Sequence, residues 1–378
     1  MERVERGSRS ADTVLLLTLV LLVGTGVTFL FSTGKPPTGS AAFGSPLADF
    51  LREQRMPLMV GFVGIFAAAW VPMSLIRRSI PFLLLGSLVL MLLTLVPGVT
   101  KPVNGARRWL FLLGISVQPS ELAKLALVLY LASIFDKKRD RMDDATNTLL
   151  PPLLVVLAFV ALTYFQNDYS TAGIILLLGL AIFFIAGVSM LHLAMFVTVA
   201  VPLAGLLLFS EEHRVRRIVT FLNPLADPTG AGYQVLASQR AFMAGGFWGN
   251  GLGQGAGKLG GLPEAQSDFV FAVVGEEMGF IGAVLVLLLF GAFAWRGFWS
   301  SAQHARSGDS FRYYLGFGIT FAIAAQALVN MAMATGLLPT TGIPLPFFSN
   351  GGSSLVVSLT MCGLLLNSER RREEGIQT

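Results

Sequence analysis

The sequence predicts an all-α integral membrane protein with about ten transmembrane helices. Of its 378 residues, 54% are hydrophobic and only 13% are charged, whereas a soluble domain carries about 25% charged residues. The apolar residues occur in runs of about 20, the length at which a helix crosses a bilayer. The runs are continuous rather than alternating, which favours helices because each segment then satisfies its own backbone hydrogen bonds.

The apolar runs divide the chain into its expected elements. The first run follows a charged segment and is longer than the apolar part of a signal peptide, so we interpret it as a retained membrane anchor. We expect residues 1–378 to form a single membrane domain, with a large extracytoplasmic loop at 210–268 between helices 7 and 8. The ten runs cover residues 13–32, 57–76, 80–97, 120–135, 149–165, 170–187, 189–209, 269–294, 313–335 and 353–367.

Positive charges predict the orientation. If the runs alternate in direction, 15 of the 27 Lys and Arg residues lie on the side of the N-terminus and 11 on the other side. Five of those 11 belong to the loop 210–268, and long loops count little because they cross the membrane regardless of charge. The short loops therefore predict that both termini are cytoplasmic. The outer cations either bind an anionic substrate or face anionic lipid headgroups.

The loop 210–268 contains two notable segments. It begins with Arg214, Arg216 and Arg217, a composition typical of an amphipathic helix on a membrane surface. Further on, residues 245–255 are rich in glycine. Such a run lets backbone N–H groups approach a phosphate, or it simply forms tight turns.

Asp268 is the last polar residue before the long apolar run 269–294. It is our candidate general base, partly desolvated at the outer membrane face and therefore raised in pKa. The alternative is that Asp268 or Ser267 caps the following helix. Glu264, four residues earlier, is a second acidic candidate.

Three ionisable residues lie within or at the ends of the apolar runs. Glu121 and Lys124 are three residues apart, so they share one helix face, and Asp168 lies between two runs. Ionisable groups inside a bilayer usually line a cavity or a pathway, although a structural ion pair is the alternative. The proline- and glycine-rich stretch 336–354 predicts irregular backbone, which is tolerated at membrane depth only against protein or water.

Several segments, in this order along the chain, match one family. They are Asn104–Trp109, Gln118–Lys124, Leu262–Phe269, Gly275–Gly279 and Leu338–Ser354. Together they resemble the SEDS family (shape, elongation, division and sporulation) of RodA, FtsW and SpoVE. The first segment and the ending Leu365–Asn367 are closer to FtsW, which favours a role in cell division over cell shape.

The resemblance implies a peptidoglycan glycosyltransferase in the bacterial cytoplasmic membrane. Such an enzyme polymerises lipid II, the undecaprenyl-pyrophosphate-linked disaccharide peptide, at the outer face, with inversion at the anomeric carbon. It implies that Asp268 is the essential carboxylate and that a class B penicillin-binding protein is the partner. Whether a divalent cation such as Mg or Mn takes part is left open. The expected substrate-binding residues are Arg108, Trp109, Glu121, Lys124, Asp168, Arg216, Arg217 and Glu264.

The chain departs from the family pattern at three places. Gln266 and Ser267 stand where histidine and threonine are common, Asn167 replaces a proline before Asp168, and Asn350 replaces a tyrosine. All acidic and basic candidates remain, although the second change weakens the assignment of a role to Asp168.

Two rival functions are a lipid II flippase, which needs no base, and a non-enzymatic scaffold for a penicillin-binding protein, which needs no ionisable residues inside the bilayer. The sequence contains no nucleotide-binding loop and no zinc-ligand spacing, and nothing in it indicates a nucleic-acid partner.

Overall fold

A computed structural model describes residues 2–33, 46–100, 102, 105–112, 115–142, 144–209, 212–230, 232–257 and 261–376. Nearly all regular structure in this part of the chain is helical, apart from one short antiparallel hairpin of β1 (Leu110–Leu112) and β2 (Ile115–Val117). The α-helices are α1 (Glu2–Ser32), α2 (Pro46–Trp70), α3 (Met73–Leu95), α4 (Pro119–Lys137), α5 (Leu150–Phe165), α6 (Tyr169–Ile185), α7 (Met190–Phe209), α8 (Glu212–Leu222), α9 (Tyr233–Gly245), α10 (Val270–Arg306), α11 (Ser310–Ala334) and α12 (Gly352–Ile376).

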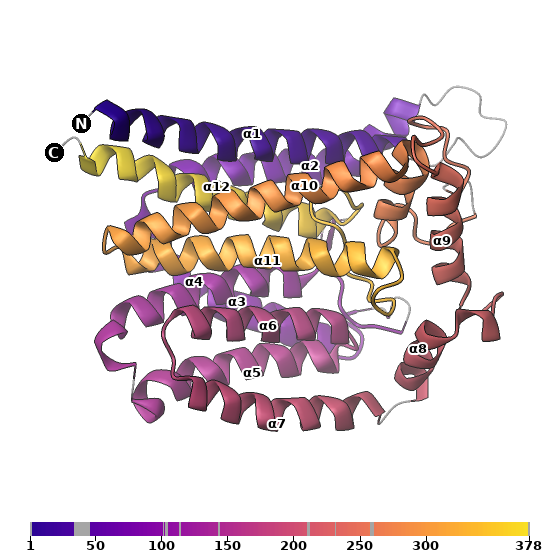
Figure 1. Ribbon diagram of the computed structural model, residues 1–378. Helices are drawn as coiled ribbons and strands as arrows, with labels where there is room; N and C mark the ends of the chain where they lie inside the picture. The colour runs from indigo at the N-terminus through magenta and orange to yellow at the C-terminus, as the bar shows by residue number, and fades with distance from the viewer. Residues whose placement is uncertain are drawn as a thin grey trace.

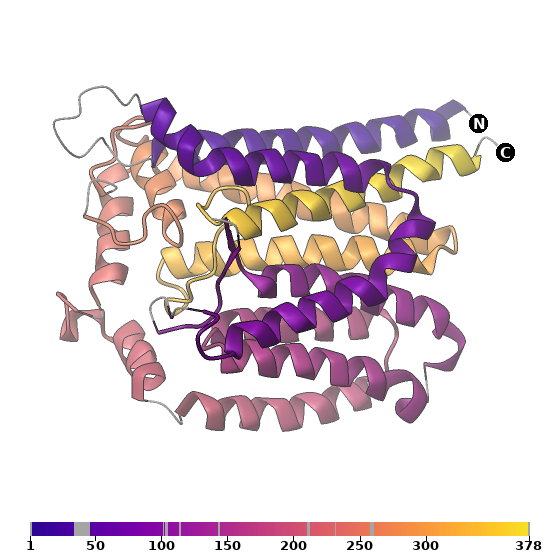
Figure 2. The same ribbon diagram turned by 180° about the vertical axis from the view of Figure 1, so that it is seen from behind.

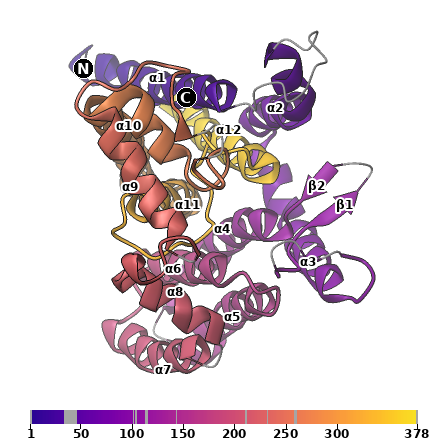
Figure 3. The ribbon, with the colours of Figure 1, turned by 90° about the vertical axis from the view of Figure 1, so that its right-hand side faces the viewer.

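The long helices lie side by side along one common direction, and both ends of the chain are at the same end of the bundle (Figures 1 and 2). Helices α8 and α9 cross the opposite end. Figure 3 looks onto that opposite end, where the β1–β2 hairpin also lies. The predicted loop 210–268 therefore contains two helices, because α8 and α9 both fall within it.

Each of the ten apolar runs corresponds mainly to one long helix, α1–α7 or α10–α12, although the run 57–76 extends from α2 into α3. Among the described residues, five helical segments are long and apolar enough to cross a membrane by length and composition. These segments are Thr13–Ser32, Met73–Leu95, Ala145–Phe165, Val270–Arg306 and Ser310–Ala334. The chain is thus a helical protein with several candidate spans, as predicted.

One predicted boundary is wrong. The second apolar run predicts a helix that ends at residue 76, with Arg77 and Arg78 between two runs. The structure ends α2 at Trp70 and begins α3 at Met73, directly after Pro72. Proline is favoured where a helix starts, because the first N–H groups of a helix have no partner there. Arg77 lies on α3 and pairs with Asp136 of α4 at 2.7 Å.

Helix α4 lies within the bundle, where it packs against α3, α5, α6, α11 and α12. Most of its side chains are buried, including Leu127, Leu131 and Phe135. A helix that is apolar on all sides suits such a position. Its first turns nevertheless carry the buried residues Glu121 and Lys124, which need polar partners.

Helix α10 is interrupted at Gly279, whose φ is +66° and ψ is −163°. The interruption frees backbone groups, and the glycine-rich segment 246–251 pairs with them. The N–H of Phe280 donates to the carbonyl of Gly246 at 2.9 Å, and the carbonyls of Glu276 and Glu277 accept from residues 250 and 251 at 3.0 and 2.9 Å. Non-helical backbone in a membrane protein is thereby satisfied by protein rather than exposed to lipid.

Candidate active site

A cavity of about 650 Å³ lies at the end of the bundle that α8 and α9 cross. Its walls come from the segments around the β1–β2 hairpin, the start of α6, the turn before α10, and the loop between α11 and α12. The lining residues are Ala106, Arg108, Trp109, Gln118, Asn167, Asp168, Tyr169, Ser170, Arg217, Gln234, Pro263, Glu264, Ser267, Asp268, Phe269, Met333, Thr340, Thr341, Gly342, Pro344, Asn350, Gly351 and Ser354.

A tight turn presents Asp268 to this cavity. Glu264, with φ +54°, accepts at its carbonyl from the N–H groups of residues 267, 268 and 269, each at 3.1 Å. Helix α10 then begins at Val270, with Phe269 as N-cap and no side-chain cap hydrogen bond. The alternative that Asp268 or Ser267 caps the helix is therefore wrong. The Ser267 hydroxyl instead donates to Oε2 of Glu264 at 2.6 Å.

The environment raises the pKa of Asp268 to about 6. Burial is the main cause, because it disfavours the charged carboxylate. The neighbouring Glu264 raises the pKa further, while Arg108 lowers it. At neutral pH the carboxylate is therefore ionised but poorly solvated, which suits a general base.

Arg108 and Asp168 form an ion pair in the cavity wall, with Nη1 of the arginine 3.4 Å from Oδ2 of the aspartate. The same oxygen accepts from Nε2 of Gln118 at 3.2 Å. The other carboxylate oxygen, Oδ1, accepts from the N–H of Thr171 at 3.3 Å, so Asp168 also caps α6. These contacts hold a buried carboxylate in one orientation.

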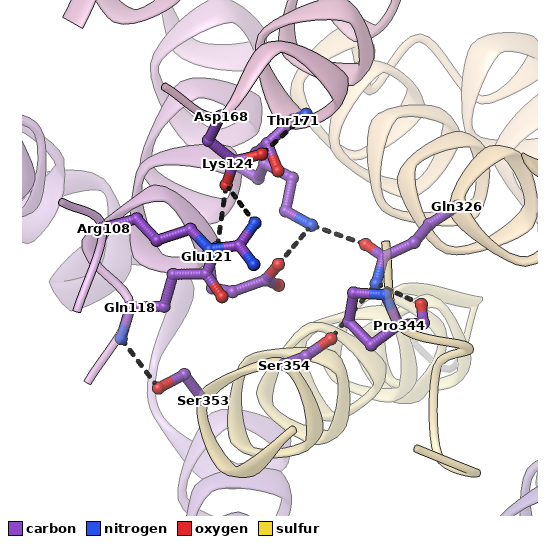
Figure 4. A network of polar contacts seen from close by, with 10 residues as sticks. All are labelled: Arg108, Gln118, Glu121, Lys124, Asp168, Thr171, Gln326, Pro344, Ser353 and Ser354. Carbon is purple, nitrogen blue, oxygen red and sulfur yellow. Dashed lines mark hydrogen bonds and ion pairs between the residues drawn. The ribbon is translucent and has the colours of Figure 1, made fainter. Parts of the chain in front are cut away.

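A buried polar network lies next to this pair (Figure 4). Lys124 donates to Oε1 of Glu121 at 2.9 Å and to Oε1 of Gln326 at 2.5 Å. Nε2 of Gln326 in turn donates to the carbonyl of Pro344 at 3.0 Å and to Oγ of Ser354 at 3.1 Å. The network therefore links α4 and α11 to the loop and the helix that form one wall of the cavity.

Helix α8 brings Arg217 to the cavity. The pKa of Arg217 is lowered, mainly because the guanidinium is partly removed from solvent. The nearby charge of Arg108 lowers it further. Asp168 and Asp268 act in the opposite direction. The guanidinium stays charged at neutral pH and keeps an exposed surface. A cation thus lies within electrostatic reach of both cavity aspartates.

Six of the nine predicted site residues line the cavity, and three do not. The six are Arg108, Trp109, Asp168, Arg217, Glu264 and Asp268. Glu121 and Lys124 pair with each other outside the lining, as the ion-pair alternative describes, so their part in substrate binding stays a prediction. Arg216 points elsewhere and pairs with Asp227 at 3.1 Å, on the protein surface.

Some predicted features lie outside the described residues. They are Asn104, the first residue of one family-like segment, and the outer cations Lys35, Lys101 and Lys258.

The glycine-rich run 245–255 does not line the cavity. Gly249 packs so closely on α10 that an added Cβ would meet the backbone of Glu277 and Met278. The carboxylate of Glu276 accepts from the N–H groups of residues 256 and 257 at 2.9–3.1 Å. The structure therefore favours the tight-turn interpretation of this run over a phosphate cradle.

Sequence reasoning missed two buried amides on α11, Gln326 and Asn330. Both bond to backbone of the loop between α11 and α12, and Asn330 also bonds to the backbone of Asp268. The available signal was their spacing: two amides four residues apart share one face of an otherwise apolar helix.

No three His, Cys, Asp or Glu side chains gather as metal ligands in the described part of the chain, so a divalent cation stays a prediction.

The fold and the cavity define a class of protein. It is a multi-pass helical membrane protein with a polar site, lined by both acidic and basic side chains, at one end of its bundle. The chain matches the family of cell cycle proteins named for FtsW, RodA and SpoVE over residues 12–374, and it belongs to that family. The resemblance inferred from sequence motifs is thereby confirmed.

Similar proteins and solved structures agree with this family assignment. The chain is 39% identical to a "Probable peptidoglycan glycosyltransferase FtsW" from Geobacter sp. (strain M18), over 98% of this chain and 99% of that protein. It is 37% identical to a protein of the same name from Borreliella burgdorferi, over 95% and 96% of the two chains. A chain described under "Structural coordination of polymerization and crosslinking by a peptidoglycan synthase complex" superposes with a TM-score of 0.75 at 30% identity, covering 95% and 97%. The crystal structure of the Thermus thermophilus rod shape determining protein RodA gives 0.67 at 28% identity, covering 95% and 96%.

Proposed function

We propose that this chain is a peptidoglycan glycosyltransferase that polymerises lipid II into glycan strands at the outer face of the bacterial cytoplasmic membrane. One observation carries the proposal: a carboxylate with a raised pKa, Asp268, shares a cavity with the guanidinium groups of Arg108 and Arg217. Family membership and the names of the FtsW relatives support the enzyme class and a role in cell division.

In the proposed reaction, the 4-hydroxyl of the acceptor sugar attacks the anomeric carbon of the growing chain. Asp268 takes the hydroxyl proton as the new C–O bond forms. The bond from the anomeric carbon to the pyrophosphate breaks, its electron pair leaves with the lipid pyrophosphate, and the anomeric configuration inverts. A base positioned in this way contributes about 10²–10⁴-fold to the rate.

The leaving pyrophosphate develops negative charge, which cations stabilise. Arg108 and Arg217 line the same cavity as Asp268, and guanidinium groups contact phosphate through two N–H groups at once. Arg108 is already paired with Asp168 at 3.4 Å. We therefore assign the main role in binding the pyrophosphate to Arg217, and a secondary role in positioning it to Arg108.

The proposed topology has ten spans, α1–α7 and α10–α12, with both termini in the cytoplasm. Because the ends of the chain lie opposite the cavity (Figure 1), this topology puts the cavity outside, where lipid II is consumed. A class B penicillin-binding protein, which crosslinks the strands, is the proposed partner. A structural relative described within a peptidoglycan synthase complex supports such an assembly.

The test is polymerisation of lipid II by the purified chain, alone and with a class B penicillin-binding protein. We expect glycan strands from the parent and almost none from Asp268→Asn, which keeps the shape of the side chain but cannot accept the proton. A flippase would expose lipid II equally well with either chain and form no strands. A scaffold would leave polymerisation unchanged by Asp268→Asn, since the activity would then belong to the partner.

A further inference from the structure

Asn330 connects two parts of the cavity that are far apart in sequence. It lies on α11 and is fully buried. Its Nδ2 donates to the carbonyl of Asp268 at 2.8 Å and to the carbonyl of Ile343 at 2.7 Å. One side-chain amide thus ties the turn before α10 to the loop after α11.

The two segments that Asn330 ties are those that meet at the proposed base. Gly342, the neighbour of Ile343, has φ +71°. A Cβ added to Gly342 would lie 3.6 Å from Oδ2 of Asp268 and 3.9 Å from Nη1 of Arg108. Gly342 therefore lies close to both charged groups, with room for a methyl group between them, and its distance from them depends on how the loop is held.

Side-chain contacts rather than regular structure hold this loop, among them Thr341 on the sulfur of Met333 and the N–H of Leu345 on Oγ of Ser349. Residues 339–345 form no helix or strand, and proline occupies three positions of the stretch 339–346, where it cannot donate a hydrogen bond. Gln326, one turn before Asn330 on α11, supplies a second side-chain bond, to the carbonyl of Pro344 at 3.0 Å. Two amides on one helix face thus fix consecutive parts of the loop to a buried helix.

We propose that Asn330 is a positioning residue for glycosyl transfer, which fixes the backbone of Asp268 at a set distance from Gly342 and Arg108. This inference rests on the proposed function of Asp268 as the base. Asn330 touches no reacting atom itself. It acts through the two carbonyls, and displacement of a reacting group by about 1 Å can cost about 100-fold in rate.

The chain contains a matched control. Asn367, on α12, is also a buried asparagine whose Nδ2 donates to two backbone carbonyls, those of Ala68 and Val71, each at 2.7 Å. It belongs to the other end of α12 and lines no part of the cavity. Asn330→Ala and Asn367→Ala each remove two hydrogen bonds of the same kind, from a side-chain amide to backbone carbonyls. The first site is near the base and the second is remote from it.

The experiment measures initial rates of lipid II polymerisation over a range of lipid II concentrations and of pH, together with thermal stability, for both Ala variants. Asn330→Asp and Asn367→Asp form a second pair, which keeps the side-chain volume but replaces the donor nitrogen by oxygen. For the Asn330 variants we expect kcat to fall about 10- to 100-fold with KM within about threefold of the parent. For Asn330→Ala, which adds no charge, we also expect the acidic limb of the rate profile to move to lower pH, because a loosened Asp268 reaches more water.

For the Asn367 variants we expect a similar loss of stability with kcat and the pH profile unchanged. The proposal is overturned if the Asn330 variants keep the kcat and pH profile of the parent. It is equally overturned if their loss of rate equals their loss of folded protein. Asp268→Asn, measured in parallel, separates the two hypotheses: if it remains active, the proposed base is wrong, whereas an inactive Asp268→Asn beside a fully active Asn330→Ala rejects the positioning role alone.

Discussion

Arg108 and Asp168 neutralise each other within the cavity wall, with 3.4 Å between Nη1 and Oδ2. Arg217 forms no salt bridge within the described part of the chain, although it lines the same cavity. An anion that enters the cavity therefore meets one cation that is already paired and one that is not. This difference assigns distinct tasks to two residues of the same type.

Arg217→Gln should weaken substrate binding more than it slows turnover. Loss of a charged hydrogen bond costs about 1.5–3 kcal/mol, so we expect KM for lipid II to rise about tenfold or more. Arg216→Gln is the matched control, because Arg216 is adjacent but pairs with Asp227 outside the cavity. Steady-state kinetics with lipid II measure both variants. Equal effects of the two substitutions would remove Arg217 from pyrophosphate binding.

The pKa of about 6 for Asp268 predicts how the rate depends on pH. A base must be ionised, so kcat/KM should be constant above pH 7 and fall about tenfold per unit below pH 6. A rate profile of the parent from pH 4.5 to 8 tests this. A rate that stays nearly constant down to pH 4.5, as the ordinary aspartate pKa of 3.8 would give, would contradict it.

The same pKa predicts an effect on stability with a defined sign. A carboxyl whose pKa is higher in the folded state stabilises the fold while it is protonated, and that contribution is lost as pH rises from about 4 through 6. Asp268→Asn cannot ionise. Its melting temperature should therefore exceed that of the parent at pH 8 and match it at pH 4, and a constant difference across this range would contradict the linkage.

Glu121 and Lys124 should prove important for folding as a pair. Their side chains are only 3% and 5% exposed and lie 2.9 Å apart. Removing one partner leaves an unpaired buried charge, which costs about 3–5 kcal/mol. Lys124→Met alone should therefore sharply reduce the yield of folded protein on size-exclusion chromatography, and the double variant Lys124→Met, Glu121→Gln should recover much of it.

Activity of that double variant separates two roles. Recovered folding with recovered polymerisation would make the pair purely structural. Recovered folding without polymerisation would support the predicted role of Lys124 in substrate binding.

Gly342→Ala should lower turnover beyond its effect on stability. Gly342 has φ +71°, and an added Cβ would enter the space beside Asp268 and Arg108. Gly308→Ala is the control, because Gly308 has φ +82° with open space around its added Cβ. Both substitutions carry about 1–2 kcal/mol of backbone strain, so both should lower the melting temperature. Only Gly342→Ala should lower kcat, and equal kcat values would show that the cavity tolerates the methyl group.

Labelling of single cysteines tests the proposed topology. Ser307 and Gln254 are exposed and lie at opposite ends of α10, and Cys362 is fully buried. In a Cys362→Ser background, a membrane-impermeant maleimide should label Gln254→Cys in intact cells and Ser307→Cys only after lysis. Labelling of both from the same side would rule out this topology.

The sequence was most informative where structure depends on local composition. The apolar runs predicted the long helices because hydropathy and length are properties of a continuous segment. The boundary between α2 and α3 was misplaced, because the apolar run continues past Pro72, where α3 begins, and hydropathy alone does not mark that start. Arg77 lies on α3 and pairs with Asp136.

The candidate site was predicted less completely, because side-chain direction depends on tertiary structure. Arg216 and Arg217 are adjacent and identical in type, yet only Arg217 lines the cavity. Asn330 carries no charge and lies in an apolar run, and its spacing from Gln326 marks a polar helix face without indicating what that face contacts. Its importance comes from the carbonyls of Asp268 and Ile343, which only folding brings together.

The pairing of segment 246–251 with the interruption of α10 at Gly279 has a practical consequence for protein engineering. A Cβ at Gly249 or Gly279 would meet the backbone of the other segment, so each surface is shaped for its particular counterpart. A chimera that takes α10 from a related synthase but keeps the native preceding loop would combine surfaces that were not selected together. The segment from residue 246 to the end of α10 should therefore be exchanged as a single cassette.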